Sequence, residues 1–293
     1  MLSFSTDCKD LTPQTGRNGQ FCVCRNERAQ LVRIKNISFK DRHLYKCTYC
    51  GTVQLFPYPI SSNDDDRCYQ SDNYLKRISE KEHYGYFHVM LEYIQSTLNL
   101  DKEAYILDFG SGYSYYQRFF LKEGFKNVHS VEINKHLVQF ARKELQLENV
   151  HDNLKGIGNK KYDLIIANQV LEHIYDPVEL INRSFYDLLK DTGVVCATVP
   201  NQGSFNRFLL RGLWIGYCPE SHIWFFDKNS LYEIFKDSKR FGITDIVVKS
   251  AVNTMHDGFV PSSFLKRMYY KTFMSLFEFI GKGDQLIIAL RKS

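Results

Sequence analysis

The sequence predicts an α/β protein in which a parallel sheet is covered by helices on both faces. Between about residues 103 and 200, apolar strand-like runs alternate with helix-like runs, a pattern typical of parallel sheets with helical crossovers. The first of these strands leads into a glycine turn and the second ends in an acid, at the edge where such sheets bind ligands. A separate segment precedes the sheet and holds six of the eight cysteines within residues 1–70.

The strands and helices of the sheet can be placed from their periodicity and end signals. Strands are expected at residues 105–109, 127–133, 162–168 and 193–200, with helices that end near Gly124, begin at Asn134 and begin at Asp176. The last helix has the clearest ends, because Asp176 is a suitable N-cap and Pro177 favours the first helical turn. Glu179 completes a capping box, and Gly193 is the expected C-terminal stop.

Further elements flank this alternating region. An amphipathic helix is expected at 74–98, a short helix at 229–237, a strand at 243–248, a helical insert at 262–280 and a last strand at 285–290. The chain is therefore expected to divide into a cysteine-rich module (1–70), a linking helix (71–102) and a main domain (103–293) with cap segments at 201–230 and 253–283.

Composition narrows the classes of function. Hydrophobic residues make up 44% and charged residues 24% of the 293 residues, which is ordinary for a globular protein. The net charge of +5 is small and the basic residues are dispersed, so no nucleic-acid partner is expected. Because there is neither a run of about eighteen apolar residues nor a signal-peptide pattern, we expect a cytoplasmic protein without a transmembrane segment. Its cysteines should then be reduced and suited to metal binding or burial.

A glycine turn follows the first strand of the sheet, in the stretch ILDFGSGYSYY. This strand carries Asp108 near its end and turns through Gly110 and Gly112 into a helix, which places backbone N–H groups beside a ligand. A dinucleotide site would need a third glycine where Tyr115 stands, and a P-loop would need a Gly-Lys-Ser/Thr that is absent, so both are excluded. Glu132 ends the next strand about twenty residues later, at the separation suited to ribose hydroxyls. The expected ligand therefore has a ribose but no pyrophosphate.

The stretches LDFGSG, VEIN and YDLIIANQVLEHIYDPVELINRSFYDLLKDTGVVCATVPN resemble the class I S-adenosylmethionine-dependent methyltransferases over residues 103–202. The resemblance implies a three-layer, Rossmann-like α/β sheet whose last strand runs antiparallel. It also implies S-adenosylmethionine as the cofactor, with Asp108, Gly110 and Gly112 along its methionine part. The other cofactor residues that it implies are Glu132 on the ribose with the adjoining Ile133, Asp152 and Asn153 near the adenine, and Asn168 and Gln169 beside the reacting methyl group.

Methyl transfer to a hydroxyl or an acidic carbon needs a group that removes a proton from the acceptor, and two histidines are candidates for this catalytic role. His222 lies in the segment expected to cover the acceptor pocket. Its surroundings, SHIWFFDKNSLYEIF, resemble a stretch of bacterial methyltransferases that act on sugars, polysaccharide ends and other metabolites. We therefore take His222 as the preferred base. His173 and its neighbour Glu172 belong to the LEH turn, where a catalytic and a structural role fit the sequence equally well.

Two cysteine pairs in the N-terminal module suit a tetrahedral, structural zinc site. They stand in FCVCRN and KCTYCG and supply Cys22, Cys24, Cys47 and Cys50. The first pair has one intervening residue where two are usual, so either Cys8 or Cys68 could replace one of its members, and plain burial of the thiols stays open. The sugar-directed methyltransferases that this chain resembles often begin with such a module, followed by a segment like RCYQSDNYL.

Together these features predict an enzyme that moves a methyl group from S-adenosylmethionine to a hydroxyl of a sugar, nucleotide-sugar or small metabolite, as in polysaccharide biosynthesis. Carbon methylation is less favoured. The Tyr, Glu and His that sugar C-methyltransferases place together correspond here to Tyr217, Glu220 and His222, but Ser221 intrudes before the histidine. Two further hypotheses are methylation of protein or RNA, and a non-catalytic scaffold that uses the cysteine module for partner contacts.

Overall fold

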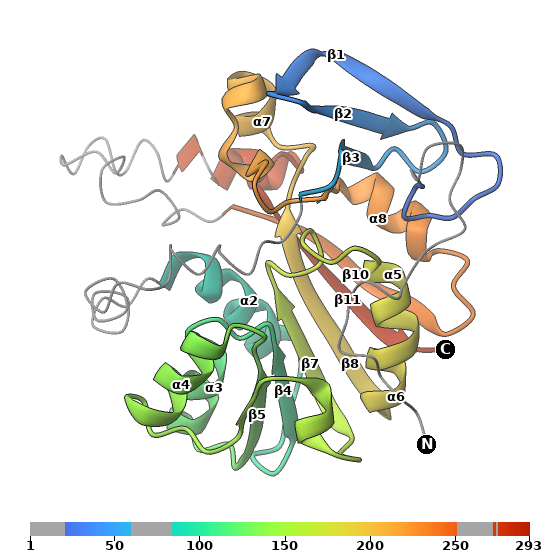
Figure 1. Ribbon diagram of the computed structural model, residues 1–293. Coiled ribbons are helices and arrows are strands. Elements are labelled where there is room, and N and C mark those ends of the chain that lie inside the picture. The colour runs from blue at the N-terminus through green and yellow to red at the C-terminus, as the bar shows by residue number, and fades with distance from the viewer. Residues whose placement is uncertain (1–20, 60–83, 251–271, 274) are drawn as a thin grey trace.

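The computed structural model describes residues 21–59, 84–250, 272–273 and 275–293, which form two sheets (Figure 1). The larger sheet consists of β4 (Tyr105–Phe109), β5 (Asn127–Val131), β6 (Val150–His151), β7 (Tyr162–Asn168), β8 (Leu189–Pro200), β10 (Phe241–Lys249) and β11 (Gln285–Lys292). Its strand order is β10-β11-β8-β7-β4-β5-β6. Strand β11 is antiparallel to both neighbours, whereas the pairs from β8 to β6 are parallel. The predicted α/β sheet with an antiparallel last strand is therefore confirmed.

Helices cover both faces of this sheet (Figure 1). One group consists of α2 (Tyr84–Thr97), α3 (Tyr115–Lys122) and α4 (Lys135–Lys143). The other group consists of α5 (Pro177–Glu179), the π-helical turn η3 (Leu180–Phe185), α6 (Tyr186–Leu188) and α8 (Lys228–Phe235). The result is a three-layer arrangement with the helical layers on opposite sides of the strands.

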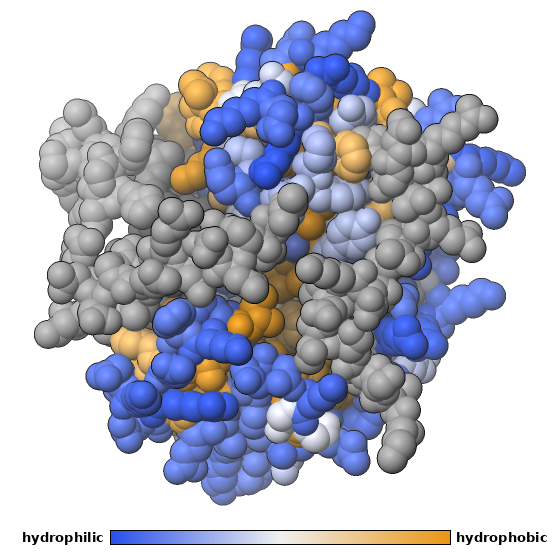
Figure 2. Space-filling model, viewed as in Figure 1, coloured by the Kyte–Doolittle hydropathy of each residue, from blue (hydrophilic) through white to orange (hydrophobic). Residues whose placement is uncertain are grey.

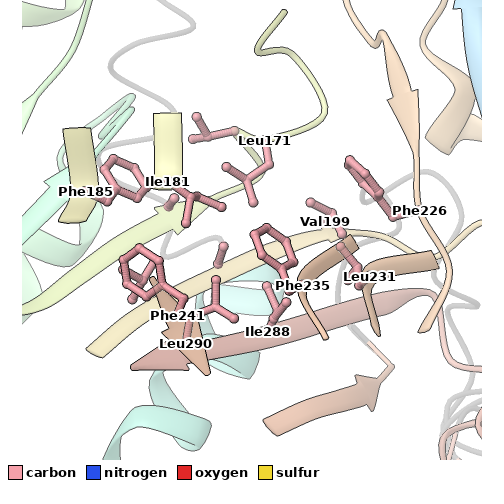
Figure 3. Packing of buried hydrophobic residues seen from close by; sticks show 14 of the residues in the cluster. Leu171, Ile181, Phe185, Val199, Phe226, Leu231, Phe235, Phe241, Ile288 and Leu290 are labelled. Carbon is pink, nitrogen blue, oxygen red and sulfur yellow. The ribbon is translucent and has the colours of Figure 1, made fainter. Parts of the chain in front are cut away.

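Alternating side chains of the strands fill two separate cores, as the period of two in a strand requires. On one face, Ile106 and Leu164 pack with Met90 and Ile94 of α2 and with Phe120 of α3. On the other face, the strand neighbours point into a second core beneath the opposite helices (Figure 3). This second core includes Leu107, Ile165, Ile181, Phe185, Leu231, Phe235, Phe241 and Ile288.

The helix that was expected at Asp176 begins at the predicted residue but ends earlier. The predicted capping box is not completed, because Oε1 of Glu179 accepts a hydrogen bond from Arg183 at 3.3 Å instead. The side chain of Asp176 accepts a hydrogen bond from the Glu179 N–H at 3.0 Å, and Pro177 is in the first turn. The predicted stop at Gly193 is wrong, because the helix ends at Leu188 and Gly193 lies inside β8. A Cβ at Gly193 would lie 2.8 Å from the Tyr162 carbonyl oxygen. This glycine therefore permits the close approach of two strands instead of capping a helix.

The smaller sheet joins two distant parts of the chain. Its order is β1-β2-β3-β9, with β1 (Leu31–Phe39), β2 (Arg42–Cys47), β3 (Val53–Phe56) and β9 (Trp224–Phe225). The fourth strand, β9, comes from the segment after β8 and pairs antiparallel with β3. The two parts also share a hydrophobic core that contains Leu44, Leu55, Trp214, Tyr217 and Phe225. The cysteine-rich module and this later segment are thus one packed unit.

The segment after β8 carries apolar side chains on its outer side as well. It contains α7 (Phe205–Leu210) and the 3-10 turns η4 (Arg211–Leu213) and η5 (Ile215–Tyr217). Figure 2 shows apolar residues gathered over α7, and the exposed ones include Phe208, Leu213 and Ile215.

Parts of two expected elements lie outside the described residues. Of the helix predicted at 74–98, the structure describes α2 (Tyr84–Thr97). Of the insert at 253–283, residues 272–273 and 275–279 are described as helical. Among all the described residues, no helix combines the length and apolar character needed to cross a membrane.

Candidate active site

The glycine turn after β4 lies at the carboxyl edge of the parallel strands. Gly110 and Gly112 both have positive φ angles, +70° and +51°, which favour glycine. A Cβ at Gly110 would lie 2.6 Å from Cγ2 of Val170, so this glycine is also required by packing. A Cβ at Gly112 would meet no atom within 4 Å. The second glycine therefore borders open space in which a ligand can lie close to the backbone.

Glu132, directly after β5, is held at this turn by two backbone amides. Its Oε2 accepts a hydrogen bond from the Gly112 N–H at 2.8 Å, and its Oε1 accepts one from the Asn134 N–H at 2.9 Å. Asn134 in turn caps α4 through its side-chain oxygen. Each carboxylate oxygen has a further lone pair, so the carboxylate can still accept hydrogen bonds from ribose hydroxyls.

Asp108, in β4 beside this turn, has the features of a group that is completed by a ligand. It is buried, and its Oδ2 has no hydrogen-bond partner. Burial, reinforced by the nearby Glu132 carboxylate, raises the pKa of Asp108 to about 8. A buried polar atom without a partner is costly. A positively charged or hydrogen-bonding part of a ligand would remove that cost.

The residues expected at the adenine end have different environments. Ile133 is 82% exposed although it is apolar and adjoins Glu132, so it offers a surface for a flat ring. Asn153 donates to Oδ1 of Asp152 at 2.6 Å. The Asn153 side chain also caps η2 (Leu154–Ile157) by accepting from the Lys155 and Gly156 N–H groups. Asn153 therefore has a local structural role that the sequence analysis did not anticipate.

The residues expected beside the methyl group are joined to the neighbouring strands. Oδ1 of Asn168 accepts a hydrogen bond from the Thr198 hydroxyl at 2.7 Å. Nε2 of Gln169 donates to Oε1 of Gln285 at 2.8 Å, and Gln169 has an unusual φ of 54°. Thr198 in β8 and Gln285 in β11 thus orient the end of β7. Sequence analysis missed both partners, because they come from strands that are distant along the chain.

The structure brings together the residues of the predicted acceptor side, Glu172, His173 and His222. One potential ligand atom from each side chain lies within 4.8 Å of those of the other two. The two imidazole rings are 4.6 Å apart between centroids at an interplanar angle of 83°. Backbone bonding creates this contact, because the N–H groups of Ile223 and Trp224 donate to the Glu172 carbonyl at 2.8 and 3.2 Å.

Hydrogen bonds define which nitrogen of each histidine is available. Nδ1 of His222 lies 2.8 Å from the Gly216 carbonyl oxygen, and Nδ1 of His173 lies 3.2 Å from that of Ser221. Because a carbonyl can only accept, each Nδ1 carries the proton and each Nε2 keeps a lone pair. Burial, and secondarily His173, lowers the pKa of His222 to about 4. His222 is therefore a neutral imidazole near pH 7.

Tyr217 and Glu220, which the carbon-methylation hypothesis would place with His222, are not part of the Glu172–His173–His222 cluster. The Tyr217 hydroxyl accepts a hydrogen bond from Nε of Arg207 at 3.2 Å, and its ring lies in the core of the small sheet. Glu220 is exposed. The carboxylate that accompanies the histidines is that of Glu172, which is buried and has no partner for either oxygen. Burial raises the pKa of Glu172 to about 8.

The four predicted cysteine ligands also come together, and their sulfur atoms form a compact cluster of Cys22, Cys24, Cys47 and Cys50. The Sγ–Sγ distances are 3.4 Å for Cys22–Cys50, 3.3 Å for Cys24–Cys22 and 3.9 Å for Cys24–Cys47. Tetrahedral zinc with Zn–S bonds of about 2.3 Å implies Sγ–Sγ distances of about 3.8 Å. The cluster therefore fits zinc in size. Cys8 and Cys68 lie outside the described residues.

Comparison with known proteins identifies the family. A family model described as a methyltransferase domain matches residues 82–238, more than half of the chain. The chain therefore belongs to this methyltransferase family, and the prediction that the protein is a methyltransferase enzyme is confirmed. No curated protein sequence matches the chain.

Solved methyltransferase structures are similar to this chain. A complex of the Haloferax volcanii Trm112 methyltransferase activator with a methyltransferase matches at a TM-score of 0.55 and 13% identity, covering 79% of this chain and 97% of that chain. The plantazolicin methyltransferase BpumL, solved with SAH, matches at a TM-score of 0.49 and 15% identity, covering 78% of this chain and 91% of that chain. An S-adenosylmethionine-dependent methyltransferase from Listeria monocytogenes matches at a TM-score of 0.47 and 13% identity, covering 72% of this chain and 100% of that chain.

The raised pKa of Asp108 predicts a pH-dependent stability. Between about pH 4 and 8 the folded protein keeps a proton that the unfolded chain releases, so the stability contribution falls as the pH rises, by up to about 1.4 kcal/mol per pH unit. Asp108→Asn removes this slope. Between pH 5 and pH 7, the free energy of unfolding of the variant should rise by about 1–3 kcal/mol relative to that of the wild type. Urea unfolding without cofactor measures this difference. Asp191→Asn, at a fully exposed side chain, is the control, and indistinguishable profiles of the two variants would contradict the prediction.

Proposed function

We propose that this enzyme transfers a methyl group from S-adenosylmethionine to a hydroxyl of a sugar, nucleotide-sugar or similar small metabolite. The observation that carries the proposal is the neutral His222, whose Nε2 is available beside His173. A neutral imidazole can accept the proton that an alcohol loses when it is methylated.

The cofactor residues fit the parts of S-adenosylmethionine in order along the carboxyl edge of the sheet. Glu132 is suited to the ribose hydroxyls, and the exposed Ile133 to one face of the adenine. The open space at Gly112 suits the methionine part. Asp108, buried with an unpartnered oxygen, suits a hydrogen-bonding or cationic group of that part. In this proposal, one set of residues contacts the nucleoside of the cofactor and another set contacts its methionine part.

Methyl transfer requires little covalent chemistry from the protein itself. The bound sulfonium supplies an activated methyl group. The residues around it need to hold the acceptor oxygen in line at near-attack distance, exclude water and take up one proton. Asn168 and Gln169 are held by β8 and β11, which suits positioning. His222 Nε2 suits the proton transfer.

An oxygen acceptor is favoured over carbon by the surroundings of His222. The Tyr217 ring is packed in the small-sheet core, and its hydroxyl is engaged by Arg207. A sugar acceptor is supported by the resemblance of SHIWFFDKNSLYEIF to sugar-directed methyltransferases, and we extend the proposal to polysaccharide biosynthesis on the same ground.

We also propose that Cys22, Cys24, Cys47 and Cys50 hold one structural zinc ion. Four thiolates would complete its coordination and leave no position for a substrate. The module would then owe part of its folding free energy to the metal.

Replacement of Glu132 tests the cofactor site. Glu132→Gln should weaken S-adenosylmethionine binding by about tenfold or more, equivalent to about 1.4 kcal/mol, because a carboxylate acceptor for the ribose is lost. Isothermal titration calorimetry measures this, with the exposed Glu123→Gln as the matched control. Equal affinity of Glu132→Gln and wild type would refute the assignment, and a wild type that does not bind would refute the proposed function.

Replacement of His222 tests the role of the base. His222→Ala should retain cofactor affinity but lose turnover by about 10²–10⁴-fold. The assay follows labelled methyl transfer to a panel of nucleotide-sugars and small alcohols, and the exposed His136→Ala serves as the control. Unchanged turnover in His222→Ala would exclude this histidine as the base.

Metal analysis tests the thiolate site. After exhaustive dialysis against a chelator under native conditions, about one zinc ion per chain should remain. Replacing Cys47 with serine should release it and lower the melting temperature, whereas replacing Cys196 with serine, at a buried cysteine in β8 remote from the cluster, should leave the zinc in place. A wild type that is folded and free of metal would disprove the site.

A further inference from the structure

We propose that Glu172, His173 and His222 form a second metal site, which binds a divalent cation of the zinc class on the acceptor side of the active site. This inference rests on the proposed function and revises one part of it. Nε2 of His222 would bind the cation, so the cation would replace the free imidazole as the group that activates the acceptor hydroxyl. The site is distinct from the cysteine cluster in position and in donor chemistry.

The three donors already converge. Their potential ligand atoms all lie within 4.8 Å of one another. Zinc with ligand bonds of about 2.0–2.1 Å requires separations of about 3.3 Å in tetrahedral geometry, so small side-chain rotations would close the site. Two imidazoles and one carboxylate are a donor set that binds catalytic zinc in proteins.

Hydrogen bonds orient both imidazoles as metal ligands. Nδ1 of His222 donates to the Gly216 carbonyl and Nδ1 of His173 to the Ser221 carbonyl. Metal-binding histidines in general donate their second nitrogen in this way, which directs the other lone pair toward the ion. In both residues the free Nε2 is thus the available donor atom.

Glu172 supplies the second, independent observation. Its side chain is fully buried, and neither carboxylate oxygen has a hydrogen-bond partner. Protonation of the carboxylate would not supply the missing hydrogen bond, because the resulting O–H would still lack an acceptor. A cation bound by Glu172 and the two histidines would satisfy the carboxylate and balance its charge.

The three residues differ in their exposure to solvent. Glu172 is buried, His222 is half-buried and His173 is exposed. A cation held here would keep an open coordination position, as catalytic zinc sites do and four-thiolate sites do not. That position suits the acceptor hydroxyl.

A bound cation would activate the acceptor by lowering the pKa of its hydroxyl. The hydroxyl proton then passes to water. The oxygen forms a C–O bond to the methyl carbon while the C–S bond of the sulfonium breaks, and the cofactor leaves as a neutral thioether. With the cation bound, activation does not require a free imidazole.

Cobalt(II) is the probe that distinguishes the two metal sites. Protein whose thiolate site is loaded with zinc is titrated with Co²⁺ at neutral pH. One equivalent should bind and give visible d–d absorption without the sulfur-to-cobalt charge-transfer bands of a thiolate site. Glu172→Gln should weaken this binding by about tenfold or more. Glu179→Gln, the same substitution in a nearby surface ion pair, should leave it unchanged.

The wild-type stoichiometry decides the inference even if a variant fails to fold. Equilibrium dialysis against Zn²⁺ should give about two ions per chain, one of them removable by mild chelation. One thiolate-bound ion alone, or equal Co²⁺ affinity in wild type and Glu172→Gln, would overturn the second site. Calorimetry with S-adenosylmethionine on the same samples separates this failure from failure of the methyltransferase proposal, since cofactor binding is measured without the second ion.

Discussion

The arrangement of the active site depends on the backbone hydrogen bonds of one residue, Ile223. Its N–H donates to the Glu172 carbonyl at 2.8 Å, and its own carbonyl accepts from the Leu55 N–H at 2.9 Å. Because both partners are backbone groups, the distances are insensitive to side-chain rotation. The turn after β7, the segment that leads into β9 and strand β3 of the small sheet are therefore joined to one another, and His222 is brought to His173 as a result.

This junction is reinforced by packing. The Trp224 indole N–H donates to the Ile174 carbonyl at 2.9 Å, and the ring of Phe21 lies 5.3 Å from Tyr175 and 5.7 Å from Trp224. Arg25, three residues after Cys22, forms an ion pair with the buried Asp176, which also caps the helix after the turn. The cysteine module therefore packs against the segment that follows Glu172 and His173, and a metal in that module would stabilise this junction through these contacts.

Two buried carboxyl groups lie at the two ends of the candidate site. Asp108 lies beside the glycine turn and Glu172 lies beside the histidines, and each has at least one oxygen without a partner. In both, burial raises the pKa to about 8. Such groups lower stability in the empty protein, and they persist where a ligand completes them. The enzyme thus keeps unsatisfied polar groups where cofactor and acceptor are expected to bind.

The sequence by itself determined the order of strands and helices, the glycine turn, the acid at position 132 and the helix cap at Asp176, because periodicity and capping depend on residues only a few positions apart. It also indicated the four cysteines. Tertiary structure alone decided that Gly193 lies in a strand, that β9 completes the small sheet and that Glu172, without a hydrogen-bond partner for its carboxylate, lies beside two histidines. These features arise from contacts between segments that are far apart along the chain, such as Leu55 with Ile223 and Glu172 with Trp224. Local patterns do not encode such contacts, since they are selected by which surfaces the folded chain buries together.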